Sequence, residues 1–87
     1  MVRPALKPED RKGYRGEKIP IFSQRVRARR LELGINQREL AERSDVKQKE
    51  ISAIEGGRFT NHCDRVIALA RALETTPNYL FGFTDEA

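Results

Sequence analysis

Residues 37–55 have the sequence QRELAERSDVKQKEISAIE, and their apolar positions recur at helical spacing. This pattern predicts two short amphipathic helices joined by a tight turn. In the first helix Leu40 and Ala41 face inward, and the small side chain of Ala41 lets the two helix backbones approach each other. In the second helix Ile51 and Ile54 face inward, and the opposite face is polar. This layout is typical of a helix-turn-helix, whose second helix reads DNA.

Local signals predict where these two helices begin and end. Asn36 is expected to cap the first helix, which runs to about residue 44, and Glu39 completes a capping-box pair. Asp45 occupies the sharp turn, where an aspartate tolerates a positive φ. The second helix is expected over residues 48–55 and stops at the two glycines that follow.

The flanking residues predict three further helices. A helix over residues 21–33 ends at Gly34, because a left-handed glycine is a common helix stop. A fourth helix follows residue 61, and a short fifth opens at Thr76 and Pro77 and ends at Gly82. The positions expected to face inward are Phe22, Val26, Arg30, Leu33, Val66, Leu69, Ala70 and Leu73. With no strand pattern, the chain is expected to be all-α, a compact domain of five helices.

Length and charge refine this organisation. The 87 residues are enough for one domain, and a net charge of +4 with a pI of about 9.6 favours a nucleic-acid partner. Residues 1–20 hold six basic and three acidic residues, three of the four prolines and no sustained periodicity, which predicts a mobile basic arm. The helix-turn-helix domain is then expected over residues 21–82, followed by a short tail over residues 83–87. Ordinary solubilising charge remains the alternative explanation of the basic excess.

Other function classes find little support in the sequence. The single cysteine, Cys63, excludes an internal disulfide and is expected to be a semi-buried space-filler. No apolar run is long enough for a signal sequence or a membrane span, so a cytoplasmic protein is expected. No carboxylate pair, Cys/His set, phosphate-binding glycine loop or metal-ligand spacing stands out. We therefore expect neither an enzyme nor a metal, cofactor or small-molecule site.

A longer run of residues carries a family resemblance. The sequence RVRARRLELGINQRELAERS at residues 25–44, followed by IxxIE at residues 51–55, resembles the DNA-binding domain of the lambdoid phage repressor and Cro family. The run spans core, cap and phosphate-contact positions together, and the resemblance covers residues 21–82. It implies a five-helix regulator that binds double-stranded DNA.

The resemblance implies a set of contacts to the DNA backbone. Gln37 matches the family glutamine that grips a phosphate with its side chain and a helix-terminal N–H, and Asn36 is similarly placed. A helix N-terminus favours an anion because its N–H groups are free and its end carries a partial positive charge. Arg58 matches a basic loop residue that contacts the backbone across the groove, and Arg27 and Arg38 are weaker phosphate candidates. Simple capping is the alternative role of Asn36.

The base-reading residues are expected on the exposed face of residues 48–55. Gln48 matches a base-reading position, and a glutamine can bond adenine at N6 and N7. Gln48 and Lys49 are expected to be the main readers, with Lys47, Ser52 and Ala53 in support. The lysines could read guanine or hold phosphate, and a merely solvated helix face is the remaining alternative.

The same resemblance assigns a structural pair and exposes three departures. Arg30 and Glu55 match a partly buried ion pair that braces two helices in the family. Lys47 stands where the family usually has a capping Ser or Thr, so the recognition helix lacks its usual side-chain cap. Asp45 replaces a common turn glycine, and Glu74 stands where a glycine often ends the fourth helix.

The function expected from this family is repression by a homodimer bound to a palindromic operator, with two recognition helices about 34 Å apart in successive major grooves. Phe59 and residues 79–83 are candidate dimer surface, although Tyr79 and Phe81 could equally be core. The arm either adds DNA contacts or is a plain disordered terminus. An antitoxin that binds a toxin protein and regulates its own operon is the main alternative, and an adaptor that associates with RNA polymerase is another.

Overall fold

The computed structural model describes residues 19–58 and 62–87, which fold into helices without a strand. The helices are α1 (Ile21–Glu32), α2 (Gln37–Ser44), α3 (Gln48–Glu55), α4 (Cys63–Ala72) and α5 (Pro77–Leu80). The predicted all-α fold and its helix order are confirmed. Apart from its last two residues, the predicted arm lies outside the described residues, as does Phe59. None of the helices that the structure describes is long and apolar enough to cross a membrane.

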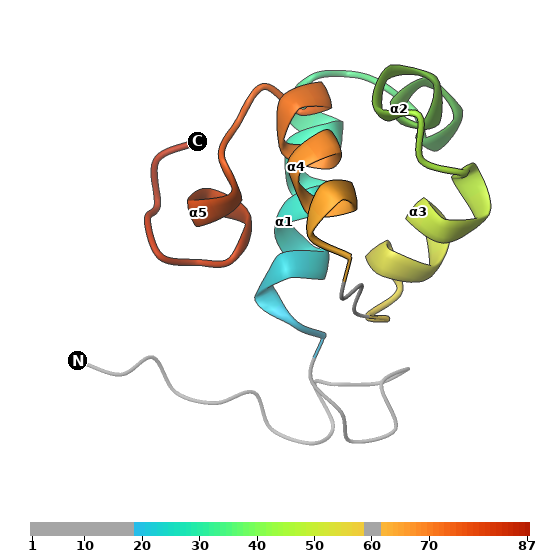
Figure 1. Ribbon diagram of the computed structural model, residues 1–87. Coiled ribbons are helices and arrows are strands. Elements are labelled where there is room, and N and C mark those ends of the chain that lie inside the picture. Colours follow the sequence, from blue (N-terminus) through green and yellow to red (C-terminus); the bar gives the residue numbers. More distant parts are fainter. Residues whose placement is uncertain (1–18, 59–61) are drawn as a thin grey trace.

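The predicted helix-turn-helix forms one side of the molecule. In Figure 1 α2 and α3 lie on one side and α5 on the other, with α1 and α4 between them. Helix α3 contacts α1 and α2, while α5 contacts α1 and α4. The inward positions meet in one core, whose most deeply buried side chains include Phe22, Val26, Leu40, Ile51, Ile54, Leu69, Leu73 and Leu80. The polar face of α3 is thereby left toward solvent.

The turns that follow α1, α2 and α4 each contain a residue in the left-handed backbone conformation. Gly34, after α1, has a φ of 71°, as predicted for a helix stop. Asp45, between α2 and α3, has a φ of 61°, and Glu74, after α4, has a φ of 57°. Asp45 and Glu74, which differ from the glycines of the family that the sequence resembles, therefore adopt a conformation that favours glycine. Aspartate does so more readily than glutamate, because its short polar side chain can bond the local backbone.

Two arginines of α1 bind the C-terminal segment and the end of α4. The Arg25 guanidinium donates to the carbonyl of Tyr79 at 2.8 Å and to that of Thr84, pairs with Asp85 at 2.7 Å, and lies 4.4 Å from the Tyr79 ring centroid. Arg29 donates from Nε to the carbonyl of Leu73 at 2.9 Å, just past the end of α4. Cationic side chains at helix C-termini satisfy carbonyls that lack intrahelical partners. Sequence reasoning did not assign these roles.

The structure corrects the expected burial of Cys63 and shows which aromatic residues of the candidate dimer surface are exposed. Cys63 is exposed rather than semi-buried, because it is the first residue of α4 and precedes the turn that packs on the core. Phe81 is partly buried and stacks on Phe22 with ring centroids 5.2 Å apart, and Tyr79 also packs against the core. Within the proposed surface of residues 79–83, the large exposed apolar side chain is Phe83, at 80% exposure.

Candidate nucleic-acid interface

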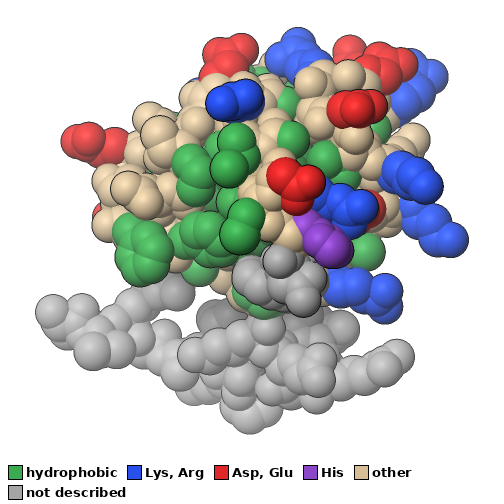
Figure 2. Space-filling view, viewed as in Figure 1, with side chains coloured by type: hydrophobic (Ala, Val, Ile, Leu, Met, Phe, Trp, Pro, Cys, Tyr) green, Lys and Arg blue, Asp and Glu red, His purple; other side chains and the backbone are tan. Residues whose placement is uncertain are grey.

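The outer face of α3 carries most of the predicted base readers. Lys47, Gln48, Lys49 and Ser52 are exposed, and Ala53 is partly buried. The inner face of the same helix is fixed by Ile51 and Ile54, both fully or almost fully buried. Figure 2 shows Lys and Arg side chains gathered along the edge of the molecule over α3, whereas apolar side chains gather over α4 and α5. The two sides of the molecule therefore differ in chemistry.

The C-terminal end of α3 is anchored to α1 by the predicted ion pair. Arg30 Nε lies 2.7 Å from Glu55 Oε2 and Arg30 Nη2 lies 3.0 Å from Oε1, so the pair is bidentate. The two side chains are only 11% and 5% exposed. The hydrogen bond to Glu55 raises the pKa of Arg30 above its ordinary value, although burial opposes the shift. Arg30 Nη1 also donates to the carbonyl of Ile35, which ties the α1–α2 connection to the pair.

A third donor completes the surroundings of Glu55. Gln37 Nε2 lies 3.2 Å from Glu55 Oε1, so the first residue of α2 is bonded to the last residue of α3. A primary amide nitrogen carries two hydrogens, which leaves one N–H of Gln37 for another acceptor. The carboxylate therefore orients the side chain that the family resemblance assigns to a phosphate. This contact was not predicted from the sequence.

The start of α2 combines a local cap with free donors. Asn36 Oδ1 accepts from the backbone N–H of Glu39 at 2.8 Å, and Glu39 Oε1 accepts from the backbone N–H of Asn36 at 2.8 Å, which confirms the capping box. Any phosphate contact from Asn36 must therefore use its side-chain nitrogen. The backbone N–H groups of Gln37 and Arg38 begin the helix and have no intrahelical acceptor, a favourable setting for an anion.

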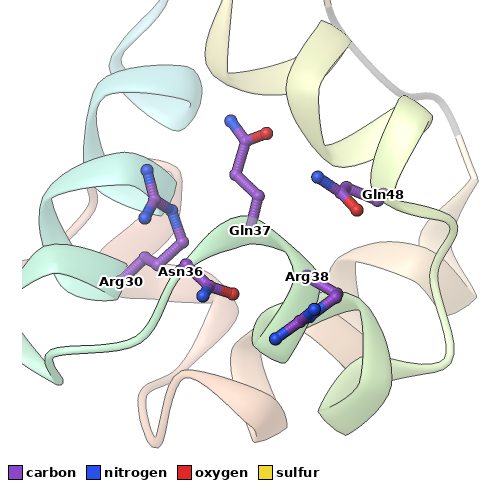
Figure 3. A pocket seen from close by; sticks show the side chains of 5 residues that line it. All are labelled: Arg30, Asn36, Gln37, Arg38 and Gln48. Atoms are coloured by element: carbon purple, nitrogen blue, oxygen red, sulfur yellow. The ribbon is translucent and has the colours of Figure 1, made fainter.

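Two adjoining hollows lie where α1, α2 and α3 meet, and together we call them the polar trough. The larger, of about 530 Å³, is lined by Arg30, Asn36, Gln37, Arg38 and Gln48. The smaller, of about 250 Å³, is lined by Arg27, Arg30, Gln37, Ser52, Glu55 and Gly56. In Figure 3 Gln37 and Gln48 extend toward the hollow from the first residues of α2 and α3, and Arg30 reaches in from α1.

The lining of the trough distinguishes it from an ordinary ligand pocket. The larger hollow has the volume of a small-molecule site, yet its lining residues are all arginine, asparagine or glutamine. Small-molecule pockets are lined mostly by apolar and aromatic side chains. A surface of cationic and amide groups beside a helix N-terminus is instead suited to phosphates and base edges.

Comparison with protein families supports the same interpretation. Residues 23–86, most of the chain, match the helix-turn-helix domain family. The chain belongs to this family. Membership indicates a DNA-binding regulator, and domains of this kind are typically not enzymes. Comparison with curated proteins and with solved structures found no significant match. The narrower resemblance to the lambdoid repressor and Cro group stays a prediction.

Some of the predicted contact residues line the trough and others lie outside it. Six of them line it: Arg27, Asn36, Gln37, Arg38, Gln48 and Ser52. Lys47 and Lys49 flank Gln48 on the exposed face of α3 but do not line either hollow. Arg58 is exposed just after α3, and its backbone N–H donates to the carbonyl of Ala53 at 2.9 Å. Among the residues that the structure describes, no cluster of metal-ligating side chains is present.

The N-terminal end of α3 has a second anchor that sequence reasoning missed. Arg65 Nη1, on α4, donates to Glu50 Oε2, so an acidic residue in the first turn of α3 pairs inward with α4. One signal was present in the sequence. A carboxylate in the first turn of a helix expected to face phosphates is electrostatically unfavourable there unless a cation neutralises it.

Proposed function

We propose that this helix-turn-helix protein is a sequence-specific regulator of transcription that binds double-stranded DNA by placing α3 in the major groove. The observation that carries the proposal is the polar trough. Six of the residues expected to contact DNA, contributed by α1, α3 and the start of α2, line this single surface beside the exposed face of α3. Residues far apart in the sequence thus converge with the chemistry that a phosphate backbone and base edges require.

The phosphate of one DNA strand is proposed to lie at the start of α2. The backbone N–H groups of Gln37 and Arg38 supply donors there, and the helix dipole adds favourable charge. Gln37 keeps one N–H on Glu55 and offers the other to the phosphate, so it enters the complex already oriented. Arg27 and Arg38 line the trough on either side and add longer-range attraction, which weakens with salt.

Base reading is proposed to fall to the first turn of α3. The exposed side chain of Gln48 lines the trough and can bond adenine at N6 and N7, a contact worth about 1–3 kcal/mol of discrimination. Lys49 lies next to it and can reach guanine O6 and N7. Ser52 follows one turn later on the same face. Phosphate contacts would set the register, and these side chains would select the sequence.

Repression is proposed to require two copies of the domain on a palindromic site. Two recognition helices spaced by about 34 Å would enter successive major grooves on one side of the duplex. Two exposed apolar side chains, Phe83 (80% exposed) and Ile21 (44% exposed), are candidates for the contact between copies. They come from neighbouring parts of the fold, because Gly82 lies against Ile21. Occupation of promoter DNA by such a dimer would exclude polymerase.

Selection of binding sites from random duplex DNA tests this proposal. The wild-type protein is expected to recover a palindrome with half-sites about one helical turn apart. The variant Gln48→Ala is expected to lose preference at one base of each half-site, whereas the control Asn78→Ala, exposed on α5, keeps the wild-type motif. Recovery of no motif, with binding that fades steeply in salt, would reduce the activity to phosphate attraction and contradict the proposal.

A further inference from the structure

The start of the recognition helix lacks a local cap. Lys47 is the N-cap residue of α3 and makes no side-chain cap hydrogen bond. Asn36 at the start of α2 and Thr76 at the start of α5 both accept a backbone N–H with their side chains. The first turn of α3, which carries Gln48 and Lys49, therefore has no side-chain cap of its own. The starts of α1 and α4 likewise show no side-chain cap hydrogen bond.

Glu50 occupies the position from which a local cap is usually completed. It is the third residue of α3, where a glutamate of a capping box turns back to the N-cap backbone. In α2 the equivalent residue, Glu39, does so. Glu50 instead accepts from Arg65, the third residue of α4, and the two side chains are 23% and 42% exposed. The contact joins the first turn of α3 to the first turn of α4.

We propose that the Glu50–Arg65 ion pair is a positioning device for the base-reading end of α3. It sets the direction of the first turn, and so the approach of Gln48 and Lys49 to the base edges, in place of the missing cap. The inference rests on the proposed DNA-reading function. Bidentate base contacts require a well-defined side-chain direction, so a first turn that moves more freely loses discrimination before it loses affinity for phosphates.

A purely electrostatic role makes a different prediction for the two partners. If the pair only balanced charge near the phosphates, removal of the Glu50 carboxylate would tighten binding to every duplex, and removal of the Arg65 charge would weaken it. A positioning role makes both removals act in the same direction on base preference. The signs of the two effects therefore separate the roles.

The test compares Glu50→Gln and Arg65→Gln with the exchange variant Glu50→Arg/Arg65→Glu. Glu42→Gln on α2 and Arg71→Gln on α4 are matched controls, because both residues are exposed and make no side-chain ion pair with any other described residue. Each protein is used to select sites from random duplex DNA. Both single variants are expected to reduce base preference at the Gln48 position from about tenfold or more to below about threefold. The exchange variant is expected to restore it, and the controls to leave it unchanged.

Amide hydrogen exchange in the DNA-free proteins supplies a second readout. The backbone N–H of Ile51 donates to the carbonyl of Lys47 at 3.0 Å and so reports the closure of the first turn. Its exchange is expected to accelerate by roughly two- to fivefold in both single variants, because a partly exposed ion pair contributes only a small stabilisation. The amide of Leu40, in α2, is expected to remain unchanged.

The outcomes separate the inference from the function on which it rests. A wild-type motif recovered unaltered from both single variants, or Ile51 exchange equal to that of the controls, would overturn the positioning role while the DNA-reading function stands. Opposite effects of the two single variants on overall affinity, without loss of preference, would also overturn it in favour of charge balance. Failure of the wild-type protein itself to select a motif would overturn the proposed function and the inference together.

Discussion

Helices α2 and α3 have the same length and follow each other in the chain, yet they are held in place by different means. The start of α2 is closed by its own residues, through reciprocal hydrogen bonds between Asn36 and Glu39. The start of α3 has no side-chain cap, and both of its ends are tied to other helices by carboxylates, Glu50 to α4 and Glu55 to α1. The start of α2 is thus held by local contacts, whereas the orientation of α3 is held by tertiary contacts.

The difference matters for what each helix presents to DNA. A capping side chain at position 47 would turn toward the helix backbone, whereas Lys47 is exposed beside Gln48. Both carboxylates of α3 are paired with arginines of other helices. The exposed face of α3 therefore presents only cationic and neutral polar side chains. We therefore expect the stability of α2 to depend on a local hydrogen bond and the stability of α3 to depend on partners in other helices.

The largest effect is expected from the distant partner of Glu55. Arg30→Met removes the cationic partner of the buried Glu55 carboxylate and is expected to lower the free energy of unfolding by about 3–5 kcal/mol, measured by urea denaturation. Arg27→Met, exposed on the same helix, is the control and is expected to change it by less than about 0.5 kcal/mol. Equal losses in the two variants would show that the ion pair does not hold α3.

A smaller effect is expected from the local cap of α2. Asn36→Ala removes the acceptor of the Glu39 N–H and is expected to cost about 1 kcal/mol of unfolding free energy. Lys47→Ala at the corresponding position of α3 is expected to cost less than about 0.5 kcal/mol, because the lysine side chain makes no cap hydrogen bond. Equal losses of stability in the two variants, measured by thermal or urea unfolding, would mean that α2 is not held by its local cap more than α3 is.

The smallest effect would come from giving α3 the cap that it lacks. Lys47 already has the extended backbone of an N-cap, with φ of −63° and ψ of 140°, so Lys47→Ser is expected to raise the unfolding free energy by about 0.5–1 kcal/mol. The gain is expected to grow in an Arg65→Gln background, where Glu50 is released to complete a capping box. A loss of stability in either background would mean that the lysine contributes through contacts other than capping.

Apart from one ion pair, the features that were predicted from the sequence have local signals. The capping box at Asn36 depends on a residue three positions away, and the turn at Asp45 depends on one backbone conformation. The Arg30–Glu55 pair spans 25 residues and was predicted only because a family resemblance assigned it. These predictions are confirmed.

The features that were missed have partners that no local pattern specifies. Arg25 and Arg29 reach carbonyls 44 to 59 residues away, and Glu50 reaches Arg65 across the α3–α4 connection. Such contacts depend on the relative placement of whole helices, which periodicity does not determine. The exposure of Cys63 was mispredicted for a related reason, since the type of a residue does not show how far the core extends toward a helix end.

Mapping of the DNA-bound face by NMR would show directly whether DNA lies against the trough and the outer face of α3. Backbone amide shifts of the whole protein would be followed while a mixed-sequence duplex of about 20 base pairs, two helical turns, is added at low salt. The account predicts that the largest changes fall on the trough and the outer face of α3, at Gln37, Arg38, Gln48, Lys49 and Ser52. Changes centred instead on the apolar side, around Ile67 and Phe83, would contradict it.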